Sequence, residues 1–273
     1  MAYLDTYFKD GISVVAVTVT PDAARKILND HNTENRPVKA GIVKKYARIM
    51  KTGDWKFSPE AISISSNGRL LNGQHRLLAI EASGVTCKFL FATGFDDDVF
   101  DVLDRGATRT LSDAFGTEKK ETECATMLAR MSGSSSLSEV TDGDVRRALD
   151  CISDAHKQLM AWSSTATKTV SSAPFRLAAI ARVMAGADRE YVFNLYRNLV
   201  LGRTEDLPPV GHATIRAVHK GRLKAYGGQV QAMNACAAWD VFNPASRNKS
   251  RIVVKYDGCV VKEIVEACGY ERA

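Results

Sequence analysis

One short helix that is apolar on nearly every side constrains this chain more than any other feature. The predicted helix covers residues 74–83, and Glu81 is its clear polar exception. Its apolar residues are Leu77, Leu78, Ala79, Ile80 and Ala82. Because a helix without a polar face is buried, this one needs neighbours all around it. Short strands are predicted at 69–71 and 86–92, so the sequence indicates a compact α/β unit over about residues 12–115.

The order of the predicted elements divides the chain into two domains, residues 1–115 and 116–273. The first is expected to hold a small mixed sheet with helices, and the second to be all-helical. Further elements expected in the first domain are strands at 12–19 and 61–65, a short helix capped by Thr20, and helices at 38–50 and from Phe95 to about Asp104. Helices expected in the second domain cover 118–131, 142–162, 174–186, 188–201, 212–226 and 228–242, before a last strand at 252–256.

The helix predicted over residues 38–50 has an apolar face and a basic face. The apolar face consists of Val38, Ile42, Tyr46, Ile49 and Met50. Lys44, Arg48 and Lys51 lie nearly opposite, and such a basic face is either simply solvated or follows a nucleic-acid backbone. We take these three residues as candidate nucleic-acid contacts. Arg216, Lys220 and Lys224 give a similar signal on successive turns of the helix predicted over 212–226.

The charge of the chain is compatible with an anionic ligand and is concentrated in the second domain. The net charge is +6 and the pI is about 9.0, which alone identifies no partner. Residues 116–273 carry 22 Lys+Arg against 17 Asp+Glu, whereas residues 1–115 carry 15 against 14. No stretch approaches the ~20 apolar residues of a bilayer span, and residues 1–5 do not resemble a secretory signal. We therefore expect a cytoplasmic protein without a membrane partner, whose six cysteines are reduced.

The segment Asn72-Gly73-Gln74-His75-Arg76 carries the strongest chemical signal. It joins a predicted strand to the start of the buried helix, where the first backbone N–H groups have no partner within the helix. The helix dipole makes that end positive, so it favours anions. Arg76 adds a guanidinium, and His75 adds a proton donor or a second phosphate ligand. The plainer alternative is an ordinary helix start in which Asn72 is the N-cap and His75 and Arg76 are solvated.

The arrangement around this segment resembles the ParB/sulfiredoxin superfamily over about residues 12–93. Members carry a G-x-x-R box at the corresponding strand–helix junction, Gly-Glu-Arg-Arg in ParB-type proteins and Gly-Cys-His-Arg in sulfiredoxins. Gly73-Gln74-His75-Arg76 is similar to the second form without its cysteine. The chain as a whole resembles ParB-like proteins of bacteriophages, in which this unit precedes a helical extension. That resemblance implies a bacterial host cell.

The resemblance implies nucleotide binding with NTP hydrolysis or phosphoryl transfer, often in proteins that act on DNA. Gly73 and Arg76 match the phosphate-binding glycine and arginine, and His75 matches the histidine of the sulfiredoxin-type box. Arg36 is similar to the arginine of the ParB N-terminal box, with a different order relative to proline. The missing cysteine argues against sulfiredoxin chemistry. Gln74, in place of glutamate, weakens an assignment to CTP.

Two more sets of residues are candidates for the same chemistry. Glu60, before the strand at 61–65, is a carboxylate that would hold Mg²⁺ or orient an attacking group, or else a surface residue. Asp104, Arg105 and Arg109 surround Gly106, so the two arginines are candidates for phosphate contacts and Asp104 for metal binding or for orienting an arginine. A similar Asp-x-Gly-x-x-Arg run is common in phage ParB-like proteins. The alternative is that these arginines pair with Asp96–Asp98.

Three functions remain open from the sequence. The first is a nucleotide-dependent enzyme that hydrolyses an NTP or transfers its phosphate, with ATP, ADP and CTP not distinguished and Mg²⁺ as a candidate cofactor. The second is a DNA-binding or regulatory protein without turnover. The third is a nuclease, which needs metal-binding carboxylates at the scissile phosphate. A homodimer is compatible with each of them.

Overall fold

The computed structural model describes residues 11–33, 35–102, 110–133, 140–163, 169–224 and 228–271. The chain forms two compact units, Met1–Thr108 and Arg109–Ala273. Helix α4 (Leu111–Phe115) belongs to the second unit, although its residues fall within the range 1–115 expected for the first domain. In the described part of the chain, no helix is both long and apolar enough to cross a membrane.

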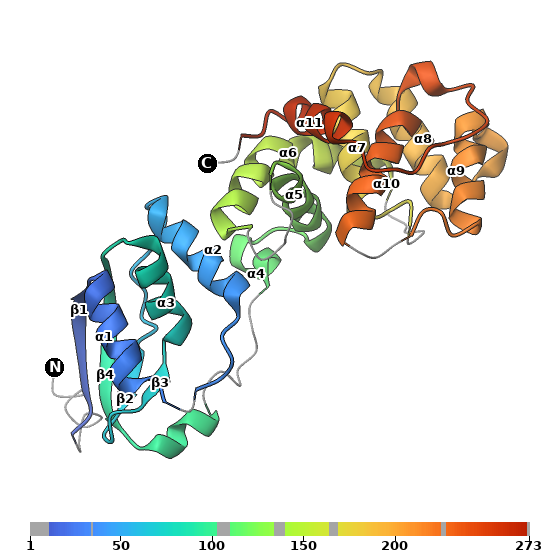
Figure 1. The fold of residues 1–273 in the computed structure, drawn as a ribbon. Helices are drawn as coiled ribbons and strands as arrows, with labels where there is room; N and C mark the ends of the chain where they lie inside the picture. Colours follow the sequence, from blue (N-terminus) through green and yellow to red (C-terminus); the bar gives the residue numbers. More distant parts are fainter. Residues whose placement is uncertain are drawn as a thin grey trace. The chain divides into compact units, whose positions relative to one another are not determined.

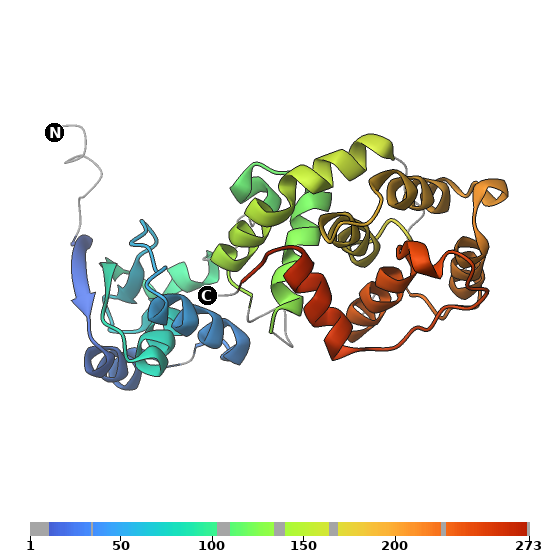
Figure 2. The same cartoon turned by 90° about the horizontal axis from the view of Figure 1, so that it is seen from above.

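The first unit is a four-stranded mixed sheet with three helices on one of its sides (Figures 1 and 2). The strands are β1 (Ser13–Val19), β2 (Ile62–Ser65), β3 (Leu70–Asn72) and β4 (Cys87–Phe95), in the order β1-β4-β2-β3. The central pair β2–β4 is parallel, and the two outer pairs are antiparallel. The helices are α1 (Pro21–His31), α2 (Ala40–Lys51) and α3 (Gln74–Ser83). This confirms the small mixed sheet expected for this region.

Helix α3 is the centre of the first unit, as its apolar sequence predicts. Leu77, Ala79 and Ile80 are fully buried, and α3 packs between α1 and α2. The unit's buried cluster joins them to Ile62 of β2 and to alternate residues of β4. Glu81, the polar exception, pairs with Arg25 of α1 at 2.9 Å. The helix therefore fixes where its own first turn lies relative to the sheet.

Several local predictions are confirmed and two need correction. Thr20 caps α1 by accepting a hydrogen bond from the Ala23 amide, and Pro21 is the first helical residue. Val38 was expected on the buried face of the second helix, but α2 begins at Ala40 and Val38 is 50 % exposed. The acidic helix expected from Phe95 is a 3-10 helix, Asp97–Val102. Residues 103–109, where it was expected to end, lie outside the described part.

The second unit is built from helices around the largely buried α7 (Ala173–Met184). The other helices are α4, α5 (Lys119–Met131), α6 (Asp142–Trp162), α8 (Arg189–Leu201), α9 (Pro209–His219), α10 (Gly228–Val241) and α11 (Gly258–Ala267). Two 3-10 turns, Thr204–Asp206 and Pro244–Ser246, connect some of them. The largest fully buried side chains here include Phe175, Phe193 and Phe242. The helical character expected for this region is confirmed.

Two predictions for the second unit are wrong, and one helix was not predicted. The helix expected over 212–226 begins at Pro209 and ends at His219, so Lys224 does not share a helix with Arg216. Residues 252–256 form no strand. The backbone in and just before this segment accepts hydrogen bonds from side chains. Arg216 donates to the Ser250 carbonyl, and Arg222 donates to the Ile252 carbonyl. Helix α11 carries an amphipathic pattern that the sequence analysis missed.

A buried histidine makes the stability of the second unit depend on pH. His156 is 2 % exposed, and its Nε2 atom has no hydrogen-bond partner among the described residues. Burial and the nearby Arg176 guanidinium lower the pKa of His156 from 6.5 to about 4. Between these two values the unfolded chain binds a proton that the folded chain does not, so acidification favours unfolding.

We predict that the free energy of unfolding falls by up to about 3 kcal/mol as the pH is lowered from 6.5 towards 4, at about 1.4 kcal/mol per pH unit,. The His156→Leu variant lacks this proton uptake, so its stability will fall less over the same range. Urea denaturation followed by tryptophan fluorescence at several pH values measures both slopes. If the two proteins lost the same stability over this pH range, His156 would not be the group that takes up the proton.

Candidate functional site

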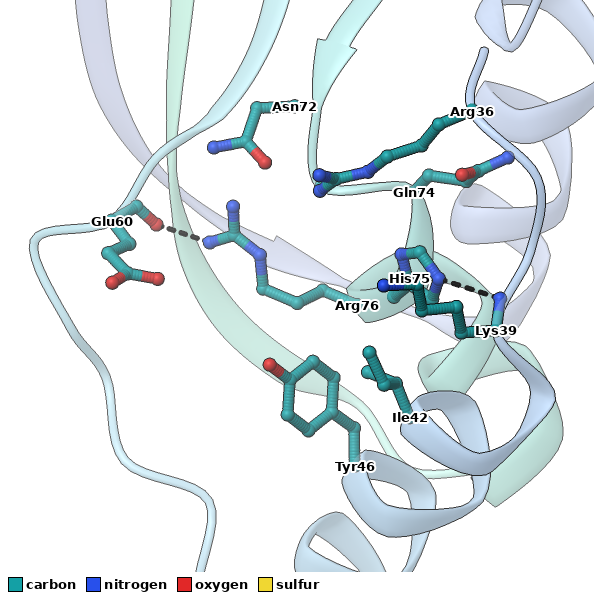
Figure 3. Close-up of a pocket in the computed structure, with 10 residues that line it drawn as sticks. Arg36, Lys39, Ile42, Tyr46, Glu60, Asn72, Gln74, His75 and Arg76 are labelled. Atoms are coloured by element: carbon teal, nitrogen blue, oxygen red, sulfur yellow. Dashed lines mark hydrogen bonds between the residues drawn. The ribbon is translucent and has the colours of Figure 1, made fainter. Parts of the chain in front are cut away.

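A cavity of about 350 Å³ lies in the first unit, beside the turn from β3 into α3. Its lining comes from the segment before α2, the first turns of α2, the loop before β2, and the β3–α3 turn. The lining residues are Arg36, Lys39, Ile42, Tyr46, Glu60, Asn72, Gly73, Gln74, His75 and Arg76 (Figure 3). The structure thus brings seven residues singled out in the sequence around one space: Arg36, Glu60 and the whole Asn72–Arg76 segment.

The starts of two helices meet at this cavity because a hydrogen bond links them. The backbone N–H of Lys39, the N-cap of α2, donates to His75 Nε2 at 3.0 Å (Figure 3). His75 lies in the first turn of α3, and Lys39 and Ile42 border the same cavity. Since the first amides of a helix have no partner inside it, the positive ends of both helices lie at the cavity.

The same hydrogen bond defines the protonation of His75. A nitrogen that accepts from an amide carries no proton, so the neutral ring has its proton on Nδ1. Burial, together with the positive charges of Arg36 and Lys39, lowers the pKa of His75 below its ordinary value. At neutral pH His75 is therefore an uncharged ring with one N–H to donate. The expectation of a proton donor is compatible with this geometry.

Arg76 holds the loop before β2 against the start of α3. Its Nη1 and Nη2 atoms donate to the carbonyls of Glu60 and Ala61, at 2.5 and 2.8 Å. The side chain is largely buried, yet its guanidinium still borders the cavity. Arg76 is thus a structural clamp as well as a cation beside the anion-favouring helix end. The alternative in which Arg76 is simply solvated is wrong.

Three cationic side chains surround the cavity together with the helix ends. Figure 3 shows the guanidinium groups of Arg36 and Arg76 and the Asn72 amide directed towards a common space, with the Lys39 side chain beside His75. Asn35 positions this edge, because its amide donates to the Leu70 carbonyl at 2.9 Å while its Oδ1 accepts from the Arg36 amide. The lining therefore contains three cationic side chains and one carboxylate, that of Glu60.

Two other expected ligands take different positions. The Gln74 side chain turns away from the cavity (Figure 3). It is buried, and within the described part of the chain its Oε1 has no hydrogen-bond partner. The Glu60 carboxylate is exposed, and it is the Glu60 carbonyl that accepts from Arg76. Asp104, Arg105 and Arg109 lie outside the described residues.

Gly73 is required by the fold itself. It is the N-cap of α3, with φ of 109°, so the alternative with Asn72 as the N-cap is wrong. A Cβ atom at Gly73 would lie 2.9 Å from Cγ1 of the fully buried Ile62. The sequence analysis attributed this glycine to close approach of a phosphate. The contact with Ile62 and the positive φ explain it without a ligand.

The sequence analysis missed three lining residues, Lys39, Ile42 and Tyr46. Ile42 and Tyr46 were assigned to the buried face of the second helix, but both are only half-buried. Tyr46 packs edge-on against Trp55, with ring centroids 5.5 Å apart. Their spacing of four residues places them on one face of α2, which was the available signal. Lys44 and Lys51 are exposed on α2, and Arg48 is half-buried.

The described residues contain no group of three or more His, Cys, Asp or Glu side chains placed to hold a metal ion. His31 instead contacts the Gly68 carbonyl through Nδ1 at 2.7 Å, which agrees with a structural role. Comparison of the chain with protein-family models, curated proteins and solved structures finds no match.

We predict that Gly73→Ala destabilises the protein by about 2–4 kcal/mol, because it combines positive-φ strain with a clash against a packed core residue. Gly84→Ala is the matched control at the other end of α3. Gly84 also has a positive φ, of 70°, but nothing lies within 4 Å of its added Cβ. The control should lose only about 1 kcal/mol. Urea denaturation measures both, and equal losses would contradict the role of Ile62.

Proposed function

We propose that the cavity binds the phosphate end of a nucleotide, and that the protein is a ParB-like enzyme that hydrolyses an NTP or transfers its phosphate. One observation carries the proposal: the starts of α2 and α3 and the cations of Arg36, Lys39 and Arg76 border the same cavity. Each of these groups favours an anion, and together they exceed what an ordinary helix start presents.

The chemistry of the lining supports a phosphate in particular. Guanidinium groups bind phosphate oxygens in a bidentate way, and unpaired backbone amides bind further oxygens. His75 offers its Nδ1–H to one more oxygen without adding a charge,. Burial keeps the pKa of His75 low, together with the charges of Arg36 and Lys39, and a bound dianion would offset the effect of these two charges,.

The other side of the cavity supports a ligand with an apolar portion. Ile42 and Tyr46 line it opposite the Asn72–Gly73 turn (Figure 3). The cavity volume of about 350 Å³ lies at the lower end of the usual range for ligand pockets, roughly 300–1,000 Å³,. We therefore propose that the nucleoside contacts Ile42 and Tyr46 while its phosphates contact the helix ends. ATP, ADP and CTP all satisfy these requirements.

Phosphoryl transfer depends mainly on positioning and on charge stabilisation. In the proposed reaction Arg36, Lys39 and Arg76 stabilise the phosphate charge, and His75 holds a proton near it. A Mg²⁺ ion would be held largely by the nucleotide phosphates, with the Glu60 carboxylate as the protein ligand within reach of the cavity. The nuclease alternative needs a set of metal ligands, for which the described residues provide no group.

We predict that ATP, ADP or CTP binds the wild-type chain and that Arg36→Ala weakens this binding about 10-fold or more, the effect of losing one charge-assisted contact. Arg36 is exposed, so its removal should change stability little, whereas Arg76 also holds a loop. Isothermal titration of each nucleotide measures the affinities, and phosphate release measures turnover.

Lys56→Ala is the matched control, since Lys56 is an exposed cation of the same unit that does not line the cavity. It should bind nucleotide as the wild type does. Equal affinity in Arg36→Ala and Lys56→Ala, or no binding to the wild type, would remove the basis of the proposal.

A further inference from the structure

A second cationic feature lies on the helical unit, formed by two stretches that are distant in the sequence. We call it the C-terminal basic surface. Its residues are Arg216, Lys220, Arg222, Lys224, Arg247, Lys249, Arg251 and Lys255. All eight are exposed. The first four lie on the last turn of α9 and just beyond it, and the others lie between α10 and α11.

Hydrogen bonds bring the two stretches together. Arg216 Nη2 donates to the Ser250 carbonyl at 2.9 Å, and Arg222 Nη2 donates to the Ile252 carbonyl at 3.4 Å. In both overall views the segment that leads to α11 runs past α9 (Figures 1 and 2). Each guanidinium keeps its charge and further N–H groups while it makes these contacts. The surface is therefore continuous over both stretches.

This surface accounts for the basic character of the whole C-terminal region. Residues 207–224 and 245–256 contain no Asp or Glu. Without the eight basic residues, residues 116–273 would hold 14 Lys+Arg against 17 Asp+Glu and be net acidic. Two of the eight have acidic neighbours in the described structure: Lys249 pairs with Asp240 at 2.8 Å, and Arg247 borders a cavity that Asp188, Glu190, Glu205 and Asp206 also line. The positive charge of this region is nevertheless concentrated in these two stretches.

The segment at 251–256 presents its cations in a defined way. Ile252 is buried and Val254 is half-buried, so the alternate residues Arg251, Val253 and Lys255 face solvent. This explains why the sequence resembled a strand: one side of an extended segment packs on the unit, although no strand pairs with it. Tyr256, at the end, is 55 % exposed. Because the backbone of this segment is already held in place, only the side chains have to be ordered when a ligand binds.

We infer that the C-terminal basic surface binds the phosphodiester backbone of a nucleic acid. Lysine and arginine side chains concentrated in two stretches that contain no Asp or Glu of their own fit a polyanion, whose binding releases condensed counterions,. The exposed Tyr256 ring adds a stacking surface for an unpaired base. An anionic membrane fits less well, because an interfacial site needs a broad apolar helix face, and the exposed large apolar residues of this segment are Val253 and Tyr256. The inference does not depend on the nucleotide pocket.

The test is fluorescence anisotropy of the full chain with a labelled DNA duplex of about 20 base pairs and the matching single strand, over roughly 50–200 mM salt. We expect the affinity to fall steeply with salt. The variant Arg251→Glu/Lys255→Glu should bind about 10-fold more weakly or worse. Its slope of log affinity against log salt should be less negative by about 2, as two phosphate contacts are lost. Both side chains are exposed and make no hydrogen bond to the described residues, so folding should be retained.

The control variant Lys157→Glu/Arg203→Glu makes the same change in net charge at exposed positions of the same unit outside the surface. It should retain most of the wild-type affinity. Equal loss in both variants would show that only net charge matters and would overturn the inference. So would a wild type that binds neither DNA, or one that binds phosphatidylserine vesicles but not DNA.

Discussion

The hydrogen bond from the Lys39 amide to His75 Nε2 sets the geometry on which the candidate site depends. Lys39, the N-cap of α2, makes no side-chain capping bond, and its own backbone N–H donates to the histidine of the next helix at 3.0 Å. Because α3 is buried between α1, α2 and the sheet, the histidine cannot move without its helix. Two helix dipoles are thereby directed at one cavity, although their sequences are more than 30 residues apart.

The polar residues at this cavity each serve the fold as well as the cavity. Arg76 fastens the Glu60–Ala61 backbone, His75 accepts from Lys39, and Asn35 joins the segment before α2 to β3. Such groups are pre-organised, since their positions are fixed before any ligand arrives. The cavity therefore presents a fixed arrangement of donors, which favours binding of an anion of defined shape.

Much of this arrangement was predictable, for physical reasons that are local to the sequence. Three local features predicted elements of the first unit: the nearly all-apolar helix, the Thr20–Pro21 cap, and the glycines at the two ends of α3. The cluster from Asn72 to Arg76 could be placed at a helix start. The role of Gly73 could not be predicted, because it depends on Ile62, a residue of another strand. The contribution of Lys39, Ile42 and Tyr46 depends on how α2 packs, and their sequence pattern resembles that of a core face. Residues 252–256 were wrongly predicted to form a strand. The alternation of apolar and polar residues shows that one side of the segment is buried, but it does not show whether another strand pairs with the backbone.

The clamp formed by Arg76 has a consequence for genetics. Its two bonds to the Glu60 and Ala61 carbonyls attach the loop before β2 to α3. A screen that scores only loss of activity will find nearly every change at this codon harmful, whether or not a ligand touches the guanidinium. Arg36 is exposed and does not bind those carbonyls. The phenotype of its codon will therefore not include loss of this clamp, and comparison of the two alleles separates the contribution of the clamp to folding from the contribution of the cavity's cations.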